Sequence, residues 1–193
     1  MRFLRICRKE SLVIAVSGRP GSGKTTLAKS LADSLGLRYV SSGGIFRRMA
    51  ERLGVSLIEM SKIAEEDYNV DRAIDNEARN EALKGGVVVD GHIAAWILRD
   101  IAHVKISVIA PLEVRVRRIA MRDSLSFEEA LRIIKSIEES EDRRFKALYG
   151  LDLNDNTVFD IIINTHTFTP EECLNISLTA VSKVLNRCVS ENL

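Results

Sequence analysis

The residues best suited to chemistry form a glycine-rich segment near the start of the chain, Gly18–Thr25, with the sequence GRPGSGKT. Its spacing matches the pattern G-x-x-x-x-G-K-[ST], the phosphate-binding loop or P-loop. It lies between an apolar stretch and an amphipathic helical pattern, as this motif requires. In such a loop, backbone N–H groups and the N-terminus of the next helix bind phosphate oxygens. Lys24 would contact the β- and γ-phosphates of a nucleotide, and Thr25 would offer its hydroxyl to Mg²⁺.

A second group of polar residues follows the next predicted strand, in the segment Ser41–Arg48 (SSGGIFRR). Ser42 is predicted to cap the following helix, and the two glycines allow a ligand to approach the backbone closely. Arg47 and Arg48 would then lie in the first turns of that helix, and the segment could form a phosphate-binding arm for a second substrate. A capped surface helix with solvated arginines is the alternative interpretation.

An acidic residue, Asp90, ends a run of three valines. In P-loop proteins an aspartate at the end of such a strand holds Mg²⁺, directly or through water. The same residue could equally cap a helix or a turn. Trp96, the only tryptophan, lies six residues further on, and packing in the core is its favoured interpretation.

A row of arginines lies on a predicted helix in the second half of the chain. Arg115, Arg118 and Arg122 follow the spacing i, i+3, i+7, so their side chains share one helix face. In a domain with a P-loop, such a row suggests a clamp on a phosphate group that is being transferred. A solvated helix face is the alternative.

The segment Ser126–Tyr149 is predicted to form one long helix. Ser126 and Glu129 have the spacing of a capping box, and apolar residues follow at helical intervals. Further along, the same stripe turns charged at Glu141 and Arg144. A helix that is apolar first and charged later is expected to leave the core and overhang a site.

The elements that must position these residues alternate between strand and helix. This predicts the α/β class, with a P-loop type parallel sheet of about five strands, helices on both faces, and one domain over residues 1–193. The predicted strands are Leu12–Ser17, Arg38–Ser41, Val87–Asp90, Val104–Ala110 and Asp160–Asn164. Helices are predicted to start near Gly23, Ser42, Val70, Leu112, Ser126 and Pro170.

Composition excludes several classes of protein. The chain has 28 Lys and Arg against 27 Asp and Glu, so bulk positive charge does not bind it to nucleic acid. No apolar run approaches the roughly 18 residues that span a bilayer, and residues 1–10 lack the features of a secretory signal. Neither the cysteines (Cys7, Cys173 and Cys188) nor the histidines have the spacing of a zinc site or a disulfide framework. We expect a cytoplasmic protein with no membrane or nucleic-acid partner.

Six segments occur in the order found in nucleoside monophosphate kinases, and from about Leu12 to Pro170 the chain most closely resembles the archaeal cytidylate kinases. They are the P-loop, S-x-G-x-I-[FY]-R, the D-G strand end, A-P-L-E-V-R, E-x-S-E-x-x-R-[FY] and D-x-x-I-N-T. The resemblance implies a core with two mobile parts, an acceptor-binding arm at about 42–84 and a lid at about 122–150. It also implies the reaction Mg-ATP + CMP (or dCMP) ⇌ ADP + CDP (or dCDP), with ATP and Mg²⁺ as cofactors. We expect the enzyme to be a monomer.

Carried over residue by residue, the resemblance implies a role for each candidate. The residues implied to bind ATP are Gly18, Arg19, Pro20, Gly21, Ser22, Gly23, Lys24, Thr25, Thr26, Thr165 and His166. Those implied to bind CMP are Ser42, Arg47, Asp90, His92 and Glu141. Thr25 and Asp90 are implied to bind Mg²⁺. The residues implied to catalyse phosphoryl transfer are Lys24, Arg118, Arg122 and Arg144. Arg115 is a further candidate for the lid hinge and the phosphate clamp.

Two positions depart from the family's pattern. Bacterial cytidylate kinases have an arginine after the D-G pair where this chain has His92, and the family's lid helix usually has one where this chain has Ile137. Each replacement removes a cationic group near the acceptor. We therefore expect weaker acceptor binding rather than a loss of phosphoryl transfer.

Three alternatives remain open at this point. The acceptor could be AMP, UMP or another small compound, or the chain could be an ATP-binding switch or assembly protein without an acceptor. It could also be an RNA-interacting ATPase that uses Arg2, Arg5, Arg8 and Lys9 as an arm. The predicted acceptor arm and the row of arginines favour a kinase, and the near-zero net charge disfavours RNA binding.

Overall fold

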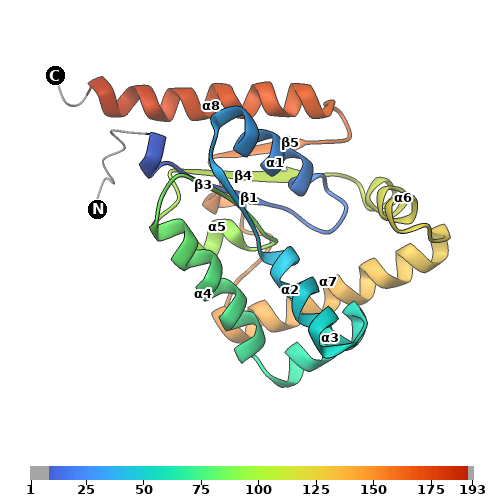
Figure 1. Cartoon of the computed structure of the whole chain (residues 1–193). Helices are drawn as coiled ribbons and strands as arrows, with labels where there is room; N and C mark the ends of the chain where they lie inside the picture. Colours follow the sequence, from blue (N-terminus) through green and yellow to red (C-terminus); the bar gives the residue numbers. More distant parts are fainter. Residues whose placement is uncertain (1–8, 191–193) are drawn as a thin grey trace.

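The computed structural model describes residues 9–190 and contains one five-stranded sheet (Figure 1). All strand pairs are parallel, in the order β2-β3-β1-β4-β5. The strands are β1 (Val13–Ser17), β2 (Arg38–Ser41), β3 (Val87–Asp90), β4 (Val104–Ile109) and β5 (Ile161–Asn164). The predicted α/β class and the five-stranded parallel sheet are confirmed.

Helices cover both faces of the sheet. They are α1 (Lys24–Leu35), α2 (Ser42–Leu53), α3 (Leu57–Glu66), α4 (Asn69–Leu83), α5 (Ala94–Ile97), α6 (Leu112–Asp123), α7 (Phe127–Tyr149) and α8 (Pro170–Ser190), with short 3-10 turns at Lys9–Ser11 and Asn156–Val158. Helices α1 and α8 pack on one face, where Leu27 and Val181 meet Ile14 in the core. Helices α4 and α5 pack on the other, where Ala78 and Leu98 meet Val13.

The strands form where the sequence predicts them, because β1 and β3 consist of small and β-branched residues that are buried on both faces. The sequence prediction misses α3 and the short α5. It also takes Ser42 as the N-cap of α2, whereas the hydroxyl of Ser41 accepts the Gly44 N–H at 3.1 Å and Ser42 is already helical. The predicted capping box of α7 is present, at Ser126 and Glu129.

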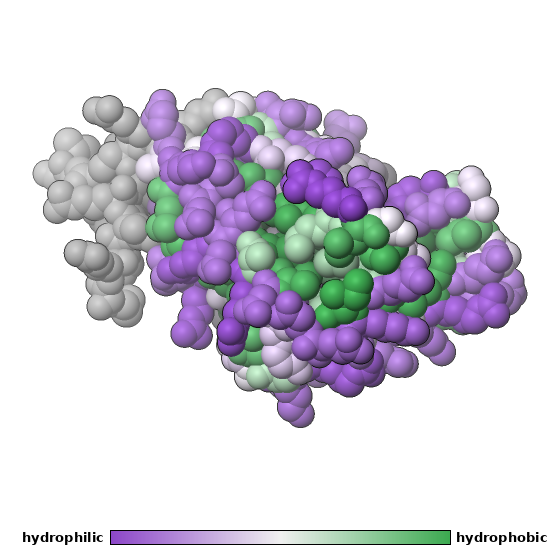
Figure 2. Space-filling model, turned by 60° about the horizontal axis from the view of Figure 1, so that its bottom comes forward, coloured by the Kyte–Doolittle hydropathy of each residue, from purple (hydrophilic) through white to green (hydrophobic). Residues whose placement is uncertain are grey.

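The segments predicted as arm and lid lie together on one side of the sheet. Helices α2, α3 and α4 lie below the sheet in Figure 1, and α7 runs back from the outer end of α6 and packs against α3. Three polar contacts join the arm to α7, pairing Glu65 with Arg143, Asp71 with Arg144, and Asp75 with Tyr149. Seen from below, this side shows apolar residues in the middle and hydrophilic residues around them (Figure 2).

Some predictions fall on parts that the structure does not describe. Cys7 and the basic residues Arg2, Arg5 and Arg8 lie outside the described residues, as do the side chains of Lys9 and Cys188. Within residues 9–190, no helix combines the length and the apolar character needed to cross a membrane.

Candidate active site

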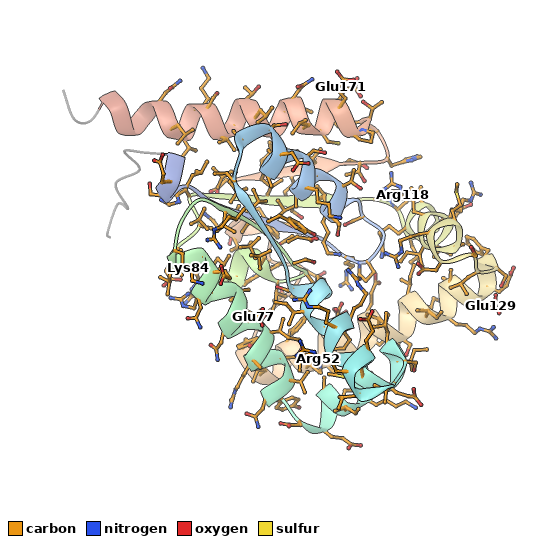
Figure 3. All side chains as sticks on the ribbon, viewed as in Figure 1. Arg52, Glu77, Lys84, Arg118, Glu129 and Glu171 are labelled. Carbon is orange, nitrogen blue, oxygen red and sulfur yellow. The ribbon has the colours of Figure 1, made fainter. Side chains whose placement is uncertain are left out.

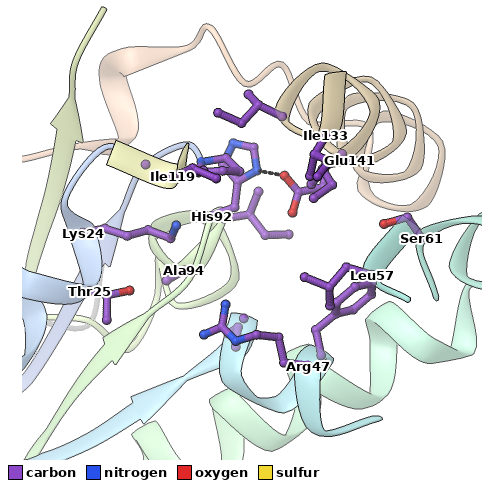
Figure 4. A pocket seen from close by; sticks show the side chains of 18 of the residues that line it. Lys24, Thr25, Arg47, Leu57, Ser61, His92, Ala94, Ile119, Ile133 and Glu141 are labelled. Carbon is purple, nitrogen blue, oxygen red and sulfur yellow. Dashed lines mark hydrogen bonds and ion pairs between the residues drawn. The ribbon is translucent and has the colours of Figure 1, made fainter. Parts of the chain in front are cut away.

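A cavity of about 930 Å³ lies between the P-loop, the arm and the α6–α7 segment (Figure 4). It brings together residues that are far apart in the sequence. The predicted site residues that line it are Pro20, Gly21, Gly23, Lys24, Thr25, Thr26, Ser42, Arg47, His92, Arg118, Arg122, Glu141 and Arg144. The other predicted site residues do not line it: Gly18, Arg19, Ser22, Asp90, Thr165 and His166. Two of these form hydrogen bonds with residues that do, because Asp90 accepts from Thr25 and Thr165 accepts from Arg118.

The P-loop follows β1 and leads directly into α1. Gly21 and Gly23 have φ values of 77° and 92°, in the left-handed region that favours glycine. A Cβ on Gly21 would also lie 2.6 Å from the carbonyl oxygen of Arg115, so a side chain there has no room. No side chain caps α1, because its N-cap is Gly23. The first N–H groups of α1 are thus available to a phosphate at the helix N-terminus.

Lys24 and Arg47 line this cavity and bring positive charge into it. Neither forms a hydrogen bond or ion pair with a described residue, and Figure 4 shows both side chains directed into the space between P-loop and arm. Unpaired positive charge in a cavity attracts anions. This end of the cavity is therefore suited to phosphate groups.

Asp90 is the centre of a buried polar cluster behind the P-loop. Its Oδ2 accepts hydrogen bonds from the Thr25 hydroxyl at 2.7 Å and the Tyr39 hydroxyl at 2.8 Å. Burial and the neighbouring Asp90 raise the pKa of Tyr39 to about 12, so Tyr39 remains a donor. The Oδ1 atom of Asp90 is buried and has no hydrogen-bond partner among the described residues. A free carboxylate oxygen beside a threonine hydroxyl is the donor set that fits Mg²⁺ and its bound water.

Two arginines of α6 hold the P-loop in place. Arg118 donates to the Gly21 carbonyl at 3.3 Å, to Thr165 Oγ1 at 2.9 Å and to the Thr165 carbonyl at 2.7 Å (Figure 3). Arg115 is buried, donates to the Pro20 and Ala110 carbonyls and pairs with Glu138. Because Arg115 is so engaged and does not line the cavity, its position argues against the phosphate clamp predicted for it.

Other predicted site residues have partners of their own. Arg122 pairs with Asp123 while lining the cavity. Arg19 is 3.3 Å from Asp142 on α7, and His166 is exposed after β5. The ATP contacts expected of Arg19, Thr165 and His166 and the catalytic role expected of Arg122 stay predictions.

His92 and Glu141 form a pair on the wall of the cavity, with Nδ1 of His92 2.7 Å from Oε2 of Glu141. The imidazole ring also meets the ring of Phe145 edge-on, with 5.8 Å between centroids. Burial alone would raise the pKa of Glu141, but His92, Lys24 and Arg144 outweigh it and keep that pKa below its usual value. Glu141 is therefore a carboxylate that fixes the imidazole ring.

Arg144 is more deeply buried than His92 and Glu141, with its side chain 3% exposed. Its Nε is 2.7 Å from Asp71 Oδ2, and it also donates to Ser140. In this structure its guanidinium is thus held between α4 and α7 rather than free to bind a transferring phosphate. Arg143, its neighbour, pairs with Glu65 and does not line the cavity.

The sequence interpretation misses the acidic residues of α4. Asp71 and Asp75 line the cavity one turn apart, and Asp71 is only 4% exposed. A signal was available, because Asp71 shares the helix face of Ile74, Ala78 and Ala82, which is the apolar stripe of α4. An acidic residue on an apolar stripe is rarely buried without a partner.

The pKa of Asp75 leads to a prediction about stability. Burial and Asp71, opposed by the hydrogen bond from Tyr149, raise this pKa from 3.8 to about 7. The folded protein then holds a proton at pH values where the unfolded chain has lost it, so stability falls as the pH rises from about 4 to about 7. Asp75→Asn should remove this component, on the order of a few kcal/mol. Urea unfolding of both proteins across this range tests it, and parallel curves would contradict it.

Comparison with known proteins gives a consistent result. The model of the cytidylate kinase-like family matches residues 13–167. The cytidylate kinase of Sulfurisphaera tokodaii is 42% identical over 183 residues, covering 94% of this chain and 99% of that protein. The cytidylate kinase of Aeropyrum pernix is 47% identical over 163 residues, covering 84% and 95%. A solved gluconokinase from Sinorhizobium meliloti has a TM-score of 0.61 at 14% identity, covering 96% of this chain and 100% of that one, and this likeness concerns the fold alone.

Proposed function

This chain belongs to the cytidylate kinase-like family and is a nucleoside monophosphate kinase that phosphorylates CMP; we propose that the donor is ATP, accompanied by Mg²⁺. The reaction would be Mg-ATP + CMP ⇌ ADP + CDP, with dCMP as a further acceptor. The observation that carries the proposal is the single cavity that the P-loop shares with Arg47, a cation without a partner among the described residues.

ATP would bind with its phosphates on the P-loop. The N–H groups at the start of α1 and the ammonium group of Lys24 face the cavity there and would bind the β- and γ-phosphates. Thr165 lies against Gly23, and a Cβ on that glycine would meet it at 3.5 Å. The adenine would then lie near Thr165 and His166, on the side where Arg118 joins β5 to the P-loop.

CMP would enter with its phosphate toward Arg47 and Ser42. Both residues belong to α2, directly after β2, and line the cavity, and the Arg47 side chain extends into it (Figure 4). The attacking oxygen of CMP is already anionic at neutral pH, so the reaction needs no strong general base. Catalysis then consists of positioning the two phosphates and neutralising their charge. Lys24, Arg47 and the arginines of α6 would provide that charge.

Closure of α7 over the cavity would exclude water and suppress hydrolysis of ATP. The contacts that join the arm to α7 support this proposal, because they hold both parts around the same space. We also propose that the enzyme acts as a cytoplasmic monomer, since the residues proposed for both substrates belong to one chain.

Thr25 and Asp90 would hold Mg²⁺. When bound, the ion would neutralise charge on the β- and γ-phosphates. Asp90→Asn keeps the size of the side chain and its acceptor for Thr25, but it removes the negative charge. We expect the Mg²⁺ concentration for half-maximal rate to rise about tenfold or more, with ATP held constant. Asp33→Asn, at an exposed position of α1, is the matched control. An unchanged Mg²⁺ requirement in Asp90→Asn would argue against this site.

A further inference from the structure

The end of the cavity opposite the P-loop is an apolar slot with a few polar groups that are buried or half-buried. Its walls include Phe46, Leu57, Ile74, Ile134 and Phe145, from α2, α3, α4 and α7. The polar groups are Ser61, Asp71, Asp75 and Arg144. Figure 4 shows Ser61 and Leu57 on the far side of the cavity from Lys24 and Thr25. A flat, mostly apolar group with a polar edge would fit such a slot.

Only one of the two carboxylates in this slot is paired with a guanidinium. Asp71 binds Arg144 through both oxygens, at 2.7 and 3.4 Å, and a third N–H of Arg144 goes to Ser140. Asp75 instead accepts a hydrogen bond from the Tyr149 hydroxyl at 2.6 Å. Asp75 therefore has no cation of its own, and burial raises its pKa to about 7. An additional N–H donor would stabilise its carboxylate form.

The slot also contains an unused hydroxyl. Ser61 is 4% exposed and lines the cavity, and its Oγ has no hydrogen-bond partner among the described residues. Arg144 keeps two of its five N–H groups free of the bonds described above. The slot thus offers a carboxylate acceptor at Asp75 and donors at Arg144 and Ser61.

Resting on the function proposed above, we propose that Asp75, oriented by Tyr149, accepts a hydrogen bond from the exocyclic amino group of cytosine and so selects CMP against UMP. With the phosphate at Arg47, the base must extend away from the P-loop, toward this slot. The cytosine edge presents one amino donor followed by two acceptors, which matches a carboxylate beside two donors. Uracil presents a carbonyl in place of the amino group, and a carboxylate opposite a carbonyl leaves both acceptors unpaired.

A purely structural role for Asp75 is the competing explanation, because the Asp75–Tyr149 contact joins α4 to α7. The two explanations differ in base selectivity. A structural role affects CMP and UMP alike, whereas a selectivity role changes their ratio. An amide at position 75 can also donate to the uracil carbonyl, so Asp75→Asn could improve the use of UMP.

The test compares kcat/KM for CMP and UMP in the wild-type enzyme and in Asp75→Asn. We expect the CMP/UMP ratio to fall at least tenfold in the variant, with the KM for ATP unchanged. Glu77→Gln is the matched control, since it removes a carboxylate from the exposed side of the same helix, and it should leave the ratio unchanged (Figure 3). A folded Asp75→Asn enzyme with the wild-type ratio would overturn the proposal.

A second measurement uses the ligand instead of the protein. The pyrimidin-2-one ribonucleoside monophosphate keeps N3 and O2 of CMP but lacks its amino group. The wild-type enzyme should use it at least tenfold less well than CMP, and Asp75→Asn should use the two about equally. If Asp75→Asn does not fold, Tyr149→Phe takes its place and should reduce the wild-type preference for CMP at least threefold. Equal use of both ligands by the wild-type enzyme, or an unchanged preference in Tyr149→Phe, would overturn the proposal. A wild-type enzyme that phosphorylates no CMP would instead refute the proposed function.

Discussion

Replacing Lys24 by methionine should lower the rate of CDP formation by a factor of about 100 or more while leaving the fold intact. The ammonium group lies in the cavity and forms no hydrogen bond or ion pair with a described residue, so its loss breaks no such bond within the protein. It does remove a charge aimed at the phosphate groups where negative charge develops, and loss of one such group typically costs about 100- to 1000-fold in rate. Single-turnover kinetics with saturating ATP and CMP measure this effect directly.

The control for Lys24→Met is Lys84→Met. Lys84 is exposed after α4, pairs with Glu81 and does not line the cavity (Figure 3). This variant should keep the wild-type rate. Near-normal turnover by Lys24→Met would mean that the P-loop does not bind the donor phosphates in the way proposed.

Replacing Arg47 by alanine should raise the KM for CMP by about 10- to 100-fold and change the KM for ATP little. Arg47 extends into the cavity from α2 and forms no ion pair or hydrogen bond with a residue that the structure describes. A hydrogen bond between a guanidinium and a phosphate is charge-assisted and contributes about 1.5–3 kcal/mol. Initial rates with each substrate varied in turn separate the two KM values.

Arg48→Ala is the matched control for this prediction. Arg48 is the next residue of the same helix, is exposed, and does not line the cavity. Its replacement should leave both KM values close to those of the wild-type enzyme. If Arg47→Ala leaves the KM for CMP unchanged, or if both variants raise it equally, Arg47 does not bind the acceptor phosphate.

The sheet and the P-loop were predictable because their signals are local. β1 and β3 are continuous apolar runs, and the glycine spacing between Gly18 and Gly23 fixes the conformation of one short loop. The position of Asp90 beside the P-loop could also be predicted, because neighbouring parallel strands end at the same edge of the sheet.

The slot opposite the P-loop depends on contacts between residues distant in the sequence. Arg144 and Asp71 are 73 residues apart, and Tyr149 and Asp75 are 74 apart. No short pattern shows that the arm and α7 face each other, so Arg144 was interpreted as a free phosphate clamp. Arg115 illustrates the same limit, because helical spacing indicates a shared face but not whether that face contacts protein or ligand.

The most direct test of the central claim is the release of ADP with each nucleoside monophosphate in turn. The purified protein would be mixed with Mg-ATP and CMP, dCMP, UMP, AMP or no acceptor, and ADP would be followed in a coupled assay. We predict the highest kcat/KM with CMP, lower values with dCMP and UMP, a poor value with AMP and almost no ADP without an acceptor. More efficient use of AMP than CMP, or ADP release that does not depend on an acceptor, would contradict the account.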